Sequence, residues 1–164
     1  MKGRVWRYGD HINTDLIISG RYLDDYDPRH LARHALEDLD PSFSQDVRYG
    51  DIIVAGRNFG CGSSREQAPV SLKTAGVAAV VATSFARIFY RNAINIGLPV
   101  VECGEAHDSF QTGQVALINI EKGVLVNEST GKGLRFEPLP PFLLDILRSG
   151  GLVNSTRKRF PPKS

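Results

Sequence analysis

The sequence predicts an α/β fold. Continuous apolar runs at residues 51–55, 76–82 and 98–102 are typical of strands that are buried on both faces of a parallel sheet. Segments with apolar residues at helical spacing separate these runs, and from residue 114 onward the pattern changes to short apolar runs divided by turn residues. A chain of 164 residues is long enough for one domain with a substantial core. We therefore expect a mostly parallel core sheet, helices packed against it and a β-rich second layer.

The N-terminal part begins with an expected strand and a polar turn. Residues 3–8 alternate weakly, which favours a strand at an edge of the sheet. Residues 9–15 (GDHINTD) place a histidine among carboxylates, a combination that can bind a metal or transfer protons, although hydrogen bonding within a loop is the simpler explanation.

Residues 28–38 predict a surface helix. His30 and His34 would share one face of it, but no third metal ligand is evident, and we expect both to face solvent.

The stretch at residues 56–66 (GRNFGCGSSRE) joins the strand at 51–55 to a helix expected at 67–76. Its three glycines indicate tight backbone turns. Ser63, Ser64 and Arg65 follow these glycines, near a helix start, where free amides, the helix dipole and an arginine fork favour an anion. Residue types and spacing leave two interpretations equally open: an anion site with a hydroxyl beside it, or a serine N-cap after a glycine loop.

The second half of the chain predicts a helix, a meander and a final helix. Residues 84–95 should form a helix with Ser84 as its N-cap, and residues 114–136 should form three short strands, at 115–120, 123–127 and 134–136. The final helix is expected within residues 140–151, which begin with prolines and end with glycines. Its inward-facing residues would be Phe142, Leu143, Ile146 and Leu147.

Composition excludes several classes of protein. The net charge of +2 gives no indication of nucleic acid or a membrane surface as a partner. No apolar run approaches the roughly 20 residues of a membrane-spanning helix. The first residues lack the apolar centre of a signal peptide, so we expect a cytoplasmic location. Cys61 and Cys103 lie far apart, without a second cysteine near either, which indicates neither a disulfide framework nor a zinc or iron–sulfur site within this chain.

Three motifs, in this order, resemble one family. The stretch GRNFGCGSSRE, with YGDHINTD before it and SFARIFYRNAINIGLP after it, is similar to the small subunits of 3-isopropylmalate dehydratase (isopropylmalate isomerase), in the aconitase superfamily. The resemblance covers residue 3 to about residue 153. It implies a three-layer β/β/α swivel domain at residues 1–154 and a basic, flexible tail at residues 155–164, whereas periodicity alone gives only an α/β fold.

The resemblance also implies roles for residues of the central stretch. In aconitase-like enzymes the first serine of GSSRE acts as the catalytic base, as an alkoxide, and this role falls to Ser63. Arg65 would bind a substrate carboxylate, Ser64 would donate a hydrogen bond to a carboxylate oxygen or to developing charge, and Asn58 would assist. The T-D dipeptide upstream lies by the active site in the superfamily, which makes Asp15 a candidate for orienting Ser63 or its neighbours.

Other residues near the motifs receive supporting roles. In the family the segment at 84–95 braces the site, so Arg87 and Arg91 are expected to stand behind the residues that contact substrate. Cys61 lies inside the loop and is expected to be a small filler rather than a nucleophile.

The segment after residue 21 is expected to set specificity. In the family it lies over the variable end of the substrate, which here involves Tyr22, Leu23, Asp24 and Asp25. Relatives that take isopropylmalate tend to have apolar residues after this tyrosine and leucine, and relatives that take a tricarboxylate such as homoaconitate tend to have an arginine. The acidic pair would repel a third carboxylate by roughly 1 kcal/mol or more. It does not resemble an isopropyl pocket either, unless both aspartates point to solvent.

The implied reaction needs a partner. Moving a hydroxyl between adjacent carbons by dehydration and rehydration requires a base and a Lewis acid. In the family the Lewis acid is a 4Fe–4S cluster held by cysteines of the large subunit, and this chain is expected to bind no cofactor or metal itself. The expected protein is thus a hydro-lyase subunit of leucine biosynthesis, inactive alone, that acts on a 2-hydroxydiacid. A homo-oligomer of the isolated chain is left open.

Two alternatives remain at this point. The chain could serve a related hydro-lyase that acts on homoaconitate, citraconate or citramalate, or dimethylmalate. It could also be a stand-alone module that holds a phosphate or carboxylate at residues 63–65 and performs no chemistry.

Overall fold

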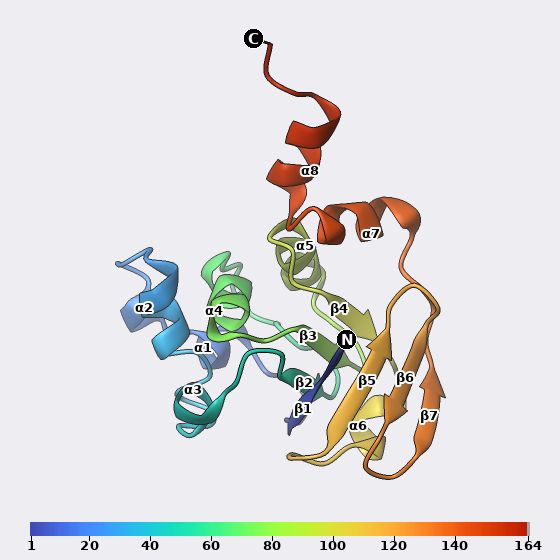
Figure 1. Cartoon of the computed structure of the whole chain (residues 1–164). Coiled ribbons are helices and arrows are strands. Elements are labelled where there is room, and N and C mark those ends of the chain that lie inside the picture. Colours follow the sequence, from blue (N-terminus) through green and yellow to red (C-terminus); the bar gives the residue numbers. More distant parts are fainter. Residues whose placement is uncertain (164) are drawn as a thin grey trace.

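A computed structural model describes residues 1–163 and contains one seven-stranded sheet in the order β4-β3-β2-β1-β5-β6-β7 (Figure 1). The strands β1 to β4 pair in parallel, and β5 to β7 continue the sheet as an antiparallel meander. The strands are β1 (Lys2–Arg7), β2 (Ile52–Ala55), β3 (Ala79–Ala82), β4 (Val100–Glu102), β5 (Val115–Asn119), β6 (Val124–Asn127) and β7 (Lys132–Arg135). The α/β class, the parallel core and the meander are therefore confirmed.

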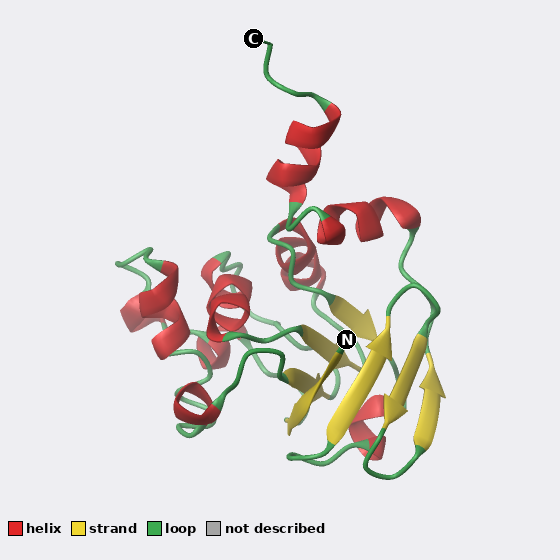
Figure 2. Ribbon diagram, viewed as in Figure 1, coloured by secondary structure: helices red, strands yellow, loops and turns green. Residues whose placement is uncertain are grey.

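The sheet curls so that its antiparallel half forms a second layer. Alternate residues of the parallel strands belong to different cores: Ile53 and Val80 face the helices, whereas Ile52 and Val81 face a cluster that includes Leu125 of β6. Because successive side chains of a strand point to opposite faces, each parallel strand is buried twice, which explains its unbroken apolar sequence. The helices, the parallel strands and the meander thus make the expected β/β/α arrangement (Figure 2).

The expectation that β1 is an edge strand is wrong. β1 lies between β2, to which it is parallel, and β5, to which it is antiparallel. Val5 and Trp6 are neighbours in the sequence, and each is buried in a different core cluster, so the strand lacks the clean alternation of a half-exposed strand. Two of its side chains are bound by Asp51, whose Oδ2 accepts hydrogen bonds from Trp6 Nε1 at 2.8 Å and Arg4 Nη2 at 3.0 Å.

Most helices cover one face of the parallel strands, and α6 lies under the other face beside the meander (Figure 2). They are α1 (Thr14–Ile17), the 3₁₀ turn η1 (Gly20–Tyr22), α2 (Pro28–Arg33), α3 (Phe43–Asp46), α4 (Gln67–Ala75), α5 (Arg87–Asn95), α6 (Ala106–Ser109), α7 (Pro141–Arg148) and α8 (Leu152–Arg159).

Two of the predicted helices are shorter than expected. The helix predicted at 28–38 ends at Arg33, and the chain then turns through Leu36, whose φ is +56°. The helix predicted at 84–95 begins only at Arg87, and its N-cap position is Ala86, so the N-cap prediction for Ser84 is wrong. Ser84 instead accepts a hydrogen bond from the backbone of Asn58, a long-range contact that local sequence does not reveal.

The C-terminal region also differs from expectation. Leu143, Ile146 and Leu147 of α7 pack against the core as predicted, but Phe142 is 58% exposed, so its predicted inward orientation is wrong. A further helix, α8, follows two glycines with positive φ and points away from the body of the molecule (Figure 1). The expected domain boundary at residues 154 and 155 falls inside α8, and the flexibility of the tail stays a prediction.

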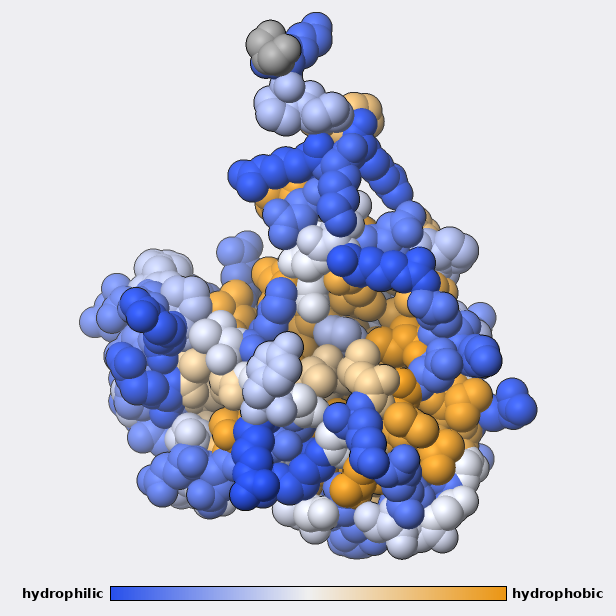
Figure 3. Space-filling view, in the orientation of Figure 1, coloured by the Kyte–Doolittle hydropathy of each residue, from blue (hydrophilic) through white to orange (hydrophobic). Residues whose placement is uncertain are grey.

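The surface is polar over the α2 side and partly apolar over the meander (Figure 3). Leu117 of β5 is 39% exposed. Across residues 1–163 no helix combines the length and the apolar character that crossing a membrane requires.

Candidate functional site

The loop at residues 56–66 leaves the carboxyl end of β2 and leads into α4. Ligand sites of open α/β sheets gather at the carboxyl ends of parallel strands, because the loops there are free to present side chains. The loop is attached to neighbours at its beginning: the amide of Gly56 donates to the carbonyl of Gly9 at 3.0 Å, and the amide of Thr83 donates to the carbonyl of Gly56 at 3.1 Å. It is thus fixed where it leaves the sheet.

The upstream GDHINTD segment lies alongside the loop. The amide of Gly60 donates to the carbonyl of Ile12 at 2.7 Å, and the amide of Thr14 donates to the carbonyl of Cys61 at 2.8 Å. The hydroxyl of Thr14, a residue only 3% exposed, donates to the carbonyl of Ser63 at 2.8 Å. The backbone position of Ser63 is therefore set by a buried residue of the preceding motif.

The downstream motif holds the other side of the loop. The amide of Phe59 donates to the carbonyl of Ser84 at 3.0 Å, and the amide of Ala86 donates to the carbonyl of Phe59 at 2.9 Å. The hydroxyl of Ser84 accepts from the amide of Asn58 at 2.8 Å. All three motifs singled out in the sequence thus meet at one place.

Gly60 allows this close packing. Its φ is +83°, and a Cβ atom at this position would lie 2.2 Å from Cγ and 2.3 Å from Cβ of Phe89 in α5. Because such a clash includes the Cβ atom of Phe89, no rotation of that side chain would relieve it. Gly60 therefore lets the loop approach the first turn of α5.

A pocket of about 200 Å³ lies between the loop and α5. Ser63, Ser64 and Arg65 contribute to one wall, and α5 contributes to the other with residues that include Arg87 and Asn92. Within residues 1–163 neither serine hydroxyl has a hydrogen-bond partner, and both serines are exposed. No side chain caps the N-terminus of α5, so the positive end of its dipole adds to the two guanidinium groups. The pocket combines free hydroxyls with positive charge, as an anionic substrate would require.

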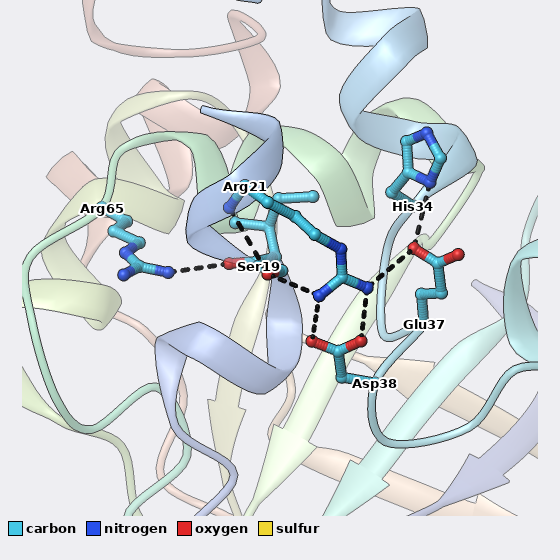
Figure 4. A network of polar contacts seen from close by, with 7 residues as sticks. Ser19, Arg21, His34, Glu37, Asp38 and Arg65 are labelled. Atoms are coloured by element: carbon cyan, nitrogen blue, oxygen red, sulfur yellow. Dashed lines mark hydrogen bonds and ion pairs between the residues drawn. The ribbon is translucent and has the colours of Figure 1, made fainter. Parts of the chain in front are cut away.

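Arg65 is held on one side only. Its Nη1 atom lies 2.5 Å from Oδ1 of Asp15 and donates to the carbonyl of Ile18 at 2.9 Å. Figure 4 shows the guanidinium reaching toward this segment. The side chain of Arg65 is 17% exposed, and among the described residues its Nε and Nη2 atoms have no hydrogen-bond partner. These two nitrogens form one edge of the planar fork, which suits a carboxylate.

Several residues expected at the site lie outside this pocket. Asp15 contacts Arg65 rather than Ser63, and its side chain is 66% exposed. Asn58 has a φ of +58°, and its side-chain nitrogen Nδ2 lies 3.3 Å from Nδ1 of His11. The contact of Asn58 with substrate stays a prediction, as does a catalytic role for Asp15.

The segment expected to set specificity packs on α2 instead of lining the pocket. The ring of Tyr22 stacks on His34 with centroids 3.7 Å apart, and Leu23 is half-buried. Asp24 and Asp25 are exposed, and Oδ1 of Asp25 accepts from the amide of Asp27 at 3.0 Å. Neither aspartate lines the pocket between the loop and α5.

A polar network around Arg21 holds the segment before Tyr22 in place (Figure 4). Arg21 donates to both carboxylate oxygens of Asp38, at 2.8 and 3.2 Å, and lies 3.8 Å from Glu37. Glu37 in turn lies 3.0 Å from Nδ1 of His34. The expectation that His30 and His34 both face solvent is wrong, because their side chains are only 22% and 26% exposed and pack against Tyr22.

Sequence reasoning underestimated one residue of the pocket. Arg87 was expected behind the residues that contact substrate, yet it lines the pocket together with Asn92, which the sequence had indicated as able to reach a ligand. A larger hollow of about 940 Å³ lies on the other side of Arg87 and is lined partly by Glu102 and Glu137. The signal that could have identified Arg87 is its position at the helix start that faces the glycine loop.

The chain does not fit an iron–sulfur cluster. Cys61 lies in the loop, and Cys103 is 3% exposed in the core on the meander side. Within residues 1–163 no three histidine, cysteine or acidic side chains come together as metal ligands. A cluster of this kind needs several cysteine thiolates, which this chain does not bring together.

Comparison with known proteins gives one consistent family. The family described as Aconitase C-terminal domain matches residues 11–105. The 3-isopropylmalate dehydratase small subunit 1 of Methanopyrus kandleri is 54% identical over 161 residues, which cover 98% of this chain and 95% of that protein. The corresponding small subunit of Thermodesulfovibrio yellowstonii is 51% identical over 160 residues, with the same coverage of 98% and 95%. The crystal structure of a 3-isopropylmalate dehydratase from Methanocaldococcus jannaschii superposes with a TM-score of 0.92 at 46% identity, over 96% of this chain and 93% of that one.

Proposed function

The chain belongs to the family of 3-isopropylmalate dehydratase small subunits, and we propose that with a large subunit it forms a hydro-lyase that interconverts 2-isopropylmalate and 3-isopropylmalate. The observation that carries the proposal is the shared pocket of Ser63, Ser64 and Arg65. A hydroxyl and a guanidinium on one wall supply a proton acceptor and a carboxylate ligand for the same small molecule.

Ser63 acts as the base in this proposal. Its hydroxyl has no intramolecular partner among the described residues, so it is free to meet the C–H bond beside a substrate carboxylate. Its backbone is fixed through Thr14, and the surrounding positive charge of Arg65, Arg87 and the start of α5 favours the alkoxide over the neutral hydroxyl. Ser64 is next to it and donates to a carboxylate oxygen.

Arg65 binds one substrate carboxylate through its Nε and Nη2 edge. Asp15 and the carbonyl of Ile18 occupy Nη1 and set the plane of the guanidinium before substrate arrives. Orientation fixed in advance lowers the entropic cost of binding. Asp15 thereby acts as a positioning residue.

The partner completes the site. A 4Fe–4S cluster on the large subunit would supply the Lewis acid that assists loss of hydroxide, and this chain supplies none of its ligands. The pocket volume of about 200 Å³ is below the usual range for small-molecule sites, as expected if a second chain forms the remaining walls. The large subunit would cover the mouth between the loop and α5.

Asp24 and Asp25 are exposed and do not line the pocket, so neither opposes an apolar substituent there, as isopropylmalate requires. Substrates of the homoaconitate, citraconate or dimethylmalate type and a non-catalytic anion-binding role are the outcomes to be tested against this assignment.

The test is reconstitution with the large subunit and assay of isopropylmalate against other 2-hydroxydiacids. Ser63→Ala should lower kcat by at least about 100-fold, since general base catalysis contributes on that order, while assembly and melting temperature stay unchanged. Ser44→Ala, in α3 and outside the pocket, is the matched control. Normal turnover by Ser63→Ala would remove the base assignment, and a wild-type complex inactive on every diacid would remove the enzyme assignment.

A further inference from the structure

Arg87 is a cationic side chain without a carboxylate partner. It is the first residue of α5, is exposed, and lines the pocket that contains Ser63. Within residues 1–163 it forms no ion pair, whereas Arg65 is already paired with Asp15. Arg65 and Arg87 are the two cationic side chains that line this pocket among the described residues.

The proposed substrate has two carboxylates, and Arg65 has one free edge. Once the large subunit covers the pocket, each carboxylate of a bound dianion needs a cationic or hydrogen-bonding partner, because an unpaired buried charge is costly. We propose that Arg87 binds the second carboxylate of the substrate, from the wall opposite Arg65. This inference rests on the proposed function and deepens it.

The distance between the two walls is fixed by the backbone. The amide of Ala86, directly before Arg87, donates to the carbonyl of Phe59 in the glycine loop at 2.9 Å, and Phe59 is fully buried. Phe89 of the same helix packs against Gly60 and Phe59. A shift of α5 relative to the loop would break these contacts, so the backbone positions from which Arg65 and Arg87 extend are fixed relative to one another.

The other polar residue on the α5 wall supports this role. Asn92 lines the pocket together with Arg87 and can donate a hydrogen bond to a carboxylate or to the substrate hydroxyl. Arg91 is exposed on the same helix but lines neither this pocket nor the larger hollow. It carries the same charge on the same helix but lies outside both hollows, which makes it the matched control.

Arg87 also borders the larger hollow, so a role in docking the large subunit is the competing explanation. The two roles predict different measurements. A substrate ligand changes KM and the preference for a second carboxylate, whereas a docking residue changes the affinity between subunits. Both quantities can be measured on the same reconstituted complex.

The experiment compares Arg87→Gln, Arg87→Lys and Arg91→Gln with the wild-type complex. KM and kcat are measured for 2-isopropylmalate and for its two monomethyl esters at saturating large subunit. Loss of one charge-assisted pair should raise KM for the diacid about 10- to 100-fold in Arg87→Gln, with partial recovery in Arg87→Lys and little change in kcat. The wild-type complex should prefer the diacid over one of the esters, and in Arg87→Gln this preference should fall by a similar factor. Arg91→Gln should behave like wild type.

Direct binding separates this inference from the proposed function. The Kd of 2-isopropylmalate for the complex is measured by calorimetry, which needs no turnover, and the subunit Kd is measured in parallel. Weaker ligand binding in Arg87→Gln with an unchanged subunit Kd supports the inference even if the wild-type complex is inactive. An unchanged ligand Kd and KM, or a change confined to the subunit Kd, would overturn it, as would absence of binding to the wild-type complex.

Discussion

Nη1 of Arg65 lies 2.5 Å from the carboxylate of Asp15, and the same nitrogen donates to the carbonyl of Ile18 at 2.9 Å. One nitrogen thus ties the GSSR stretch to the segment before η1, while Nε and Nη2 have no hydrogen-bond partner among the described residues. The residue that is proposed to bind substrate also holds together the two motifs that form the site. Its two functions use different nitrogens, so a substitution can separate them.

Arg65→Lys should affect binding more than folding. A lysine ammonium can still reach Asp15 or the carbonyl of Ile18, but it lacks the second planar edge. We expect a melting temperature within a few degrees of wild type and a KM raised about 10-fold or more in the reconstituted complex. Thermal unfolding of the isolated chain and steady-state kinetics measure the two effects. A KM equal to that of wild type would show that the free edge does not bind substrate.

Gly60→Ala should destabilise the chain more than Gly62→Ala. Both glycines have positive φ, +83° and +96°, so an alanine costs roughly 1 kcal/mol of backbone strain at either position. Only at Gly60 does the new Cβ atom clash with Phe89, at 2.2 Å, whereas at Gly62 the nearest atom is 3.4 Å away. The difference between the two variants should exceed about 1 kcal/mol in urea unfolding. Equal stabilities would mean that α5 moves freely relative to the loop.

Asp10 should contribute stability that depends on pH. Its carboxylate accepts the amide of Arg57 at 2.7 Å, and this hydrogen bond, with the nearby positive charges, holds the pKa of Asp10 below its usual value. Because the pKa is lower in the folded state, the contribution is fully present above the unfolded pKa, about 3.9, and is lost as the pH falls through the folded value. Urea unfolding of wild type and Asp10→Asn from pH 7 to pH 3 should therefore give curves that converge on acidification. A constant difference would contradict this.

The two cysteines should differ in reactivity. Burial raises the pKa of the Cys103 thiol, which is 3% exposed, so little thiolate forms at neutral pH. Cys61 is half-buried in the loop. Iodoacetamide at neutral pH should modify Cys61 in the folded chain and Cys103 only after unfolding, as followed by mass spectrometry of tryptic peptides. Early modification of Cys103 would indicate local opening of the core beneath the meander.

The parallel strands and the meander could be predicted because their signals are local. Residues 52–55 and 79–82 are buried on both faces, and this double burial requires apolar residues at every position. The central position of β1 in the sheet could not be predicted, because the sequence of a six-residue strand does not show which other strands pair with it. The N-cap prediction for Ser84 failed for a related reason, since its partner Asn58 is 26 residues away.

The residues of the candidate site also differ in whether a local sequence signal or a tertiary contact places them. Ser63, Ser64 and Arg65 were identified from their glycine-rich context and the resemblance, and they do share a pocket. Tyr22 and the residues after it were expected there from the resemblance, but the ring of Tyr22 stacks on His34 at the end of α2. Arg87 was underestimated because its contribution depends on how α5 docks on Gly60, a tertiary contact.

The central place of β1 has a consequence for biosynthesis. The first strand to leave the ribosome has β2 as one neighbour, but its other neighbour, β5, begins only at Val115. Until that segment emerges, one side of β1 carries unpaired amides and carbonyls that can pair with another chain. Nascent chains stalled before residue 115 should therefore be prone to aggregate, and productive folding should begin only when most of the polypeptide has been translated.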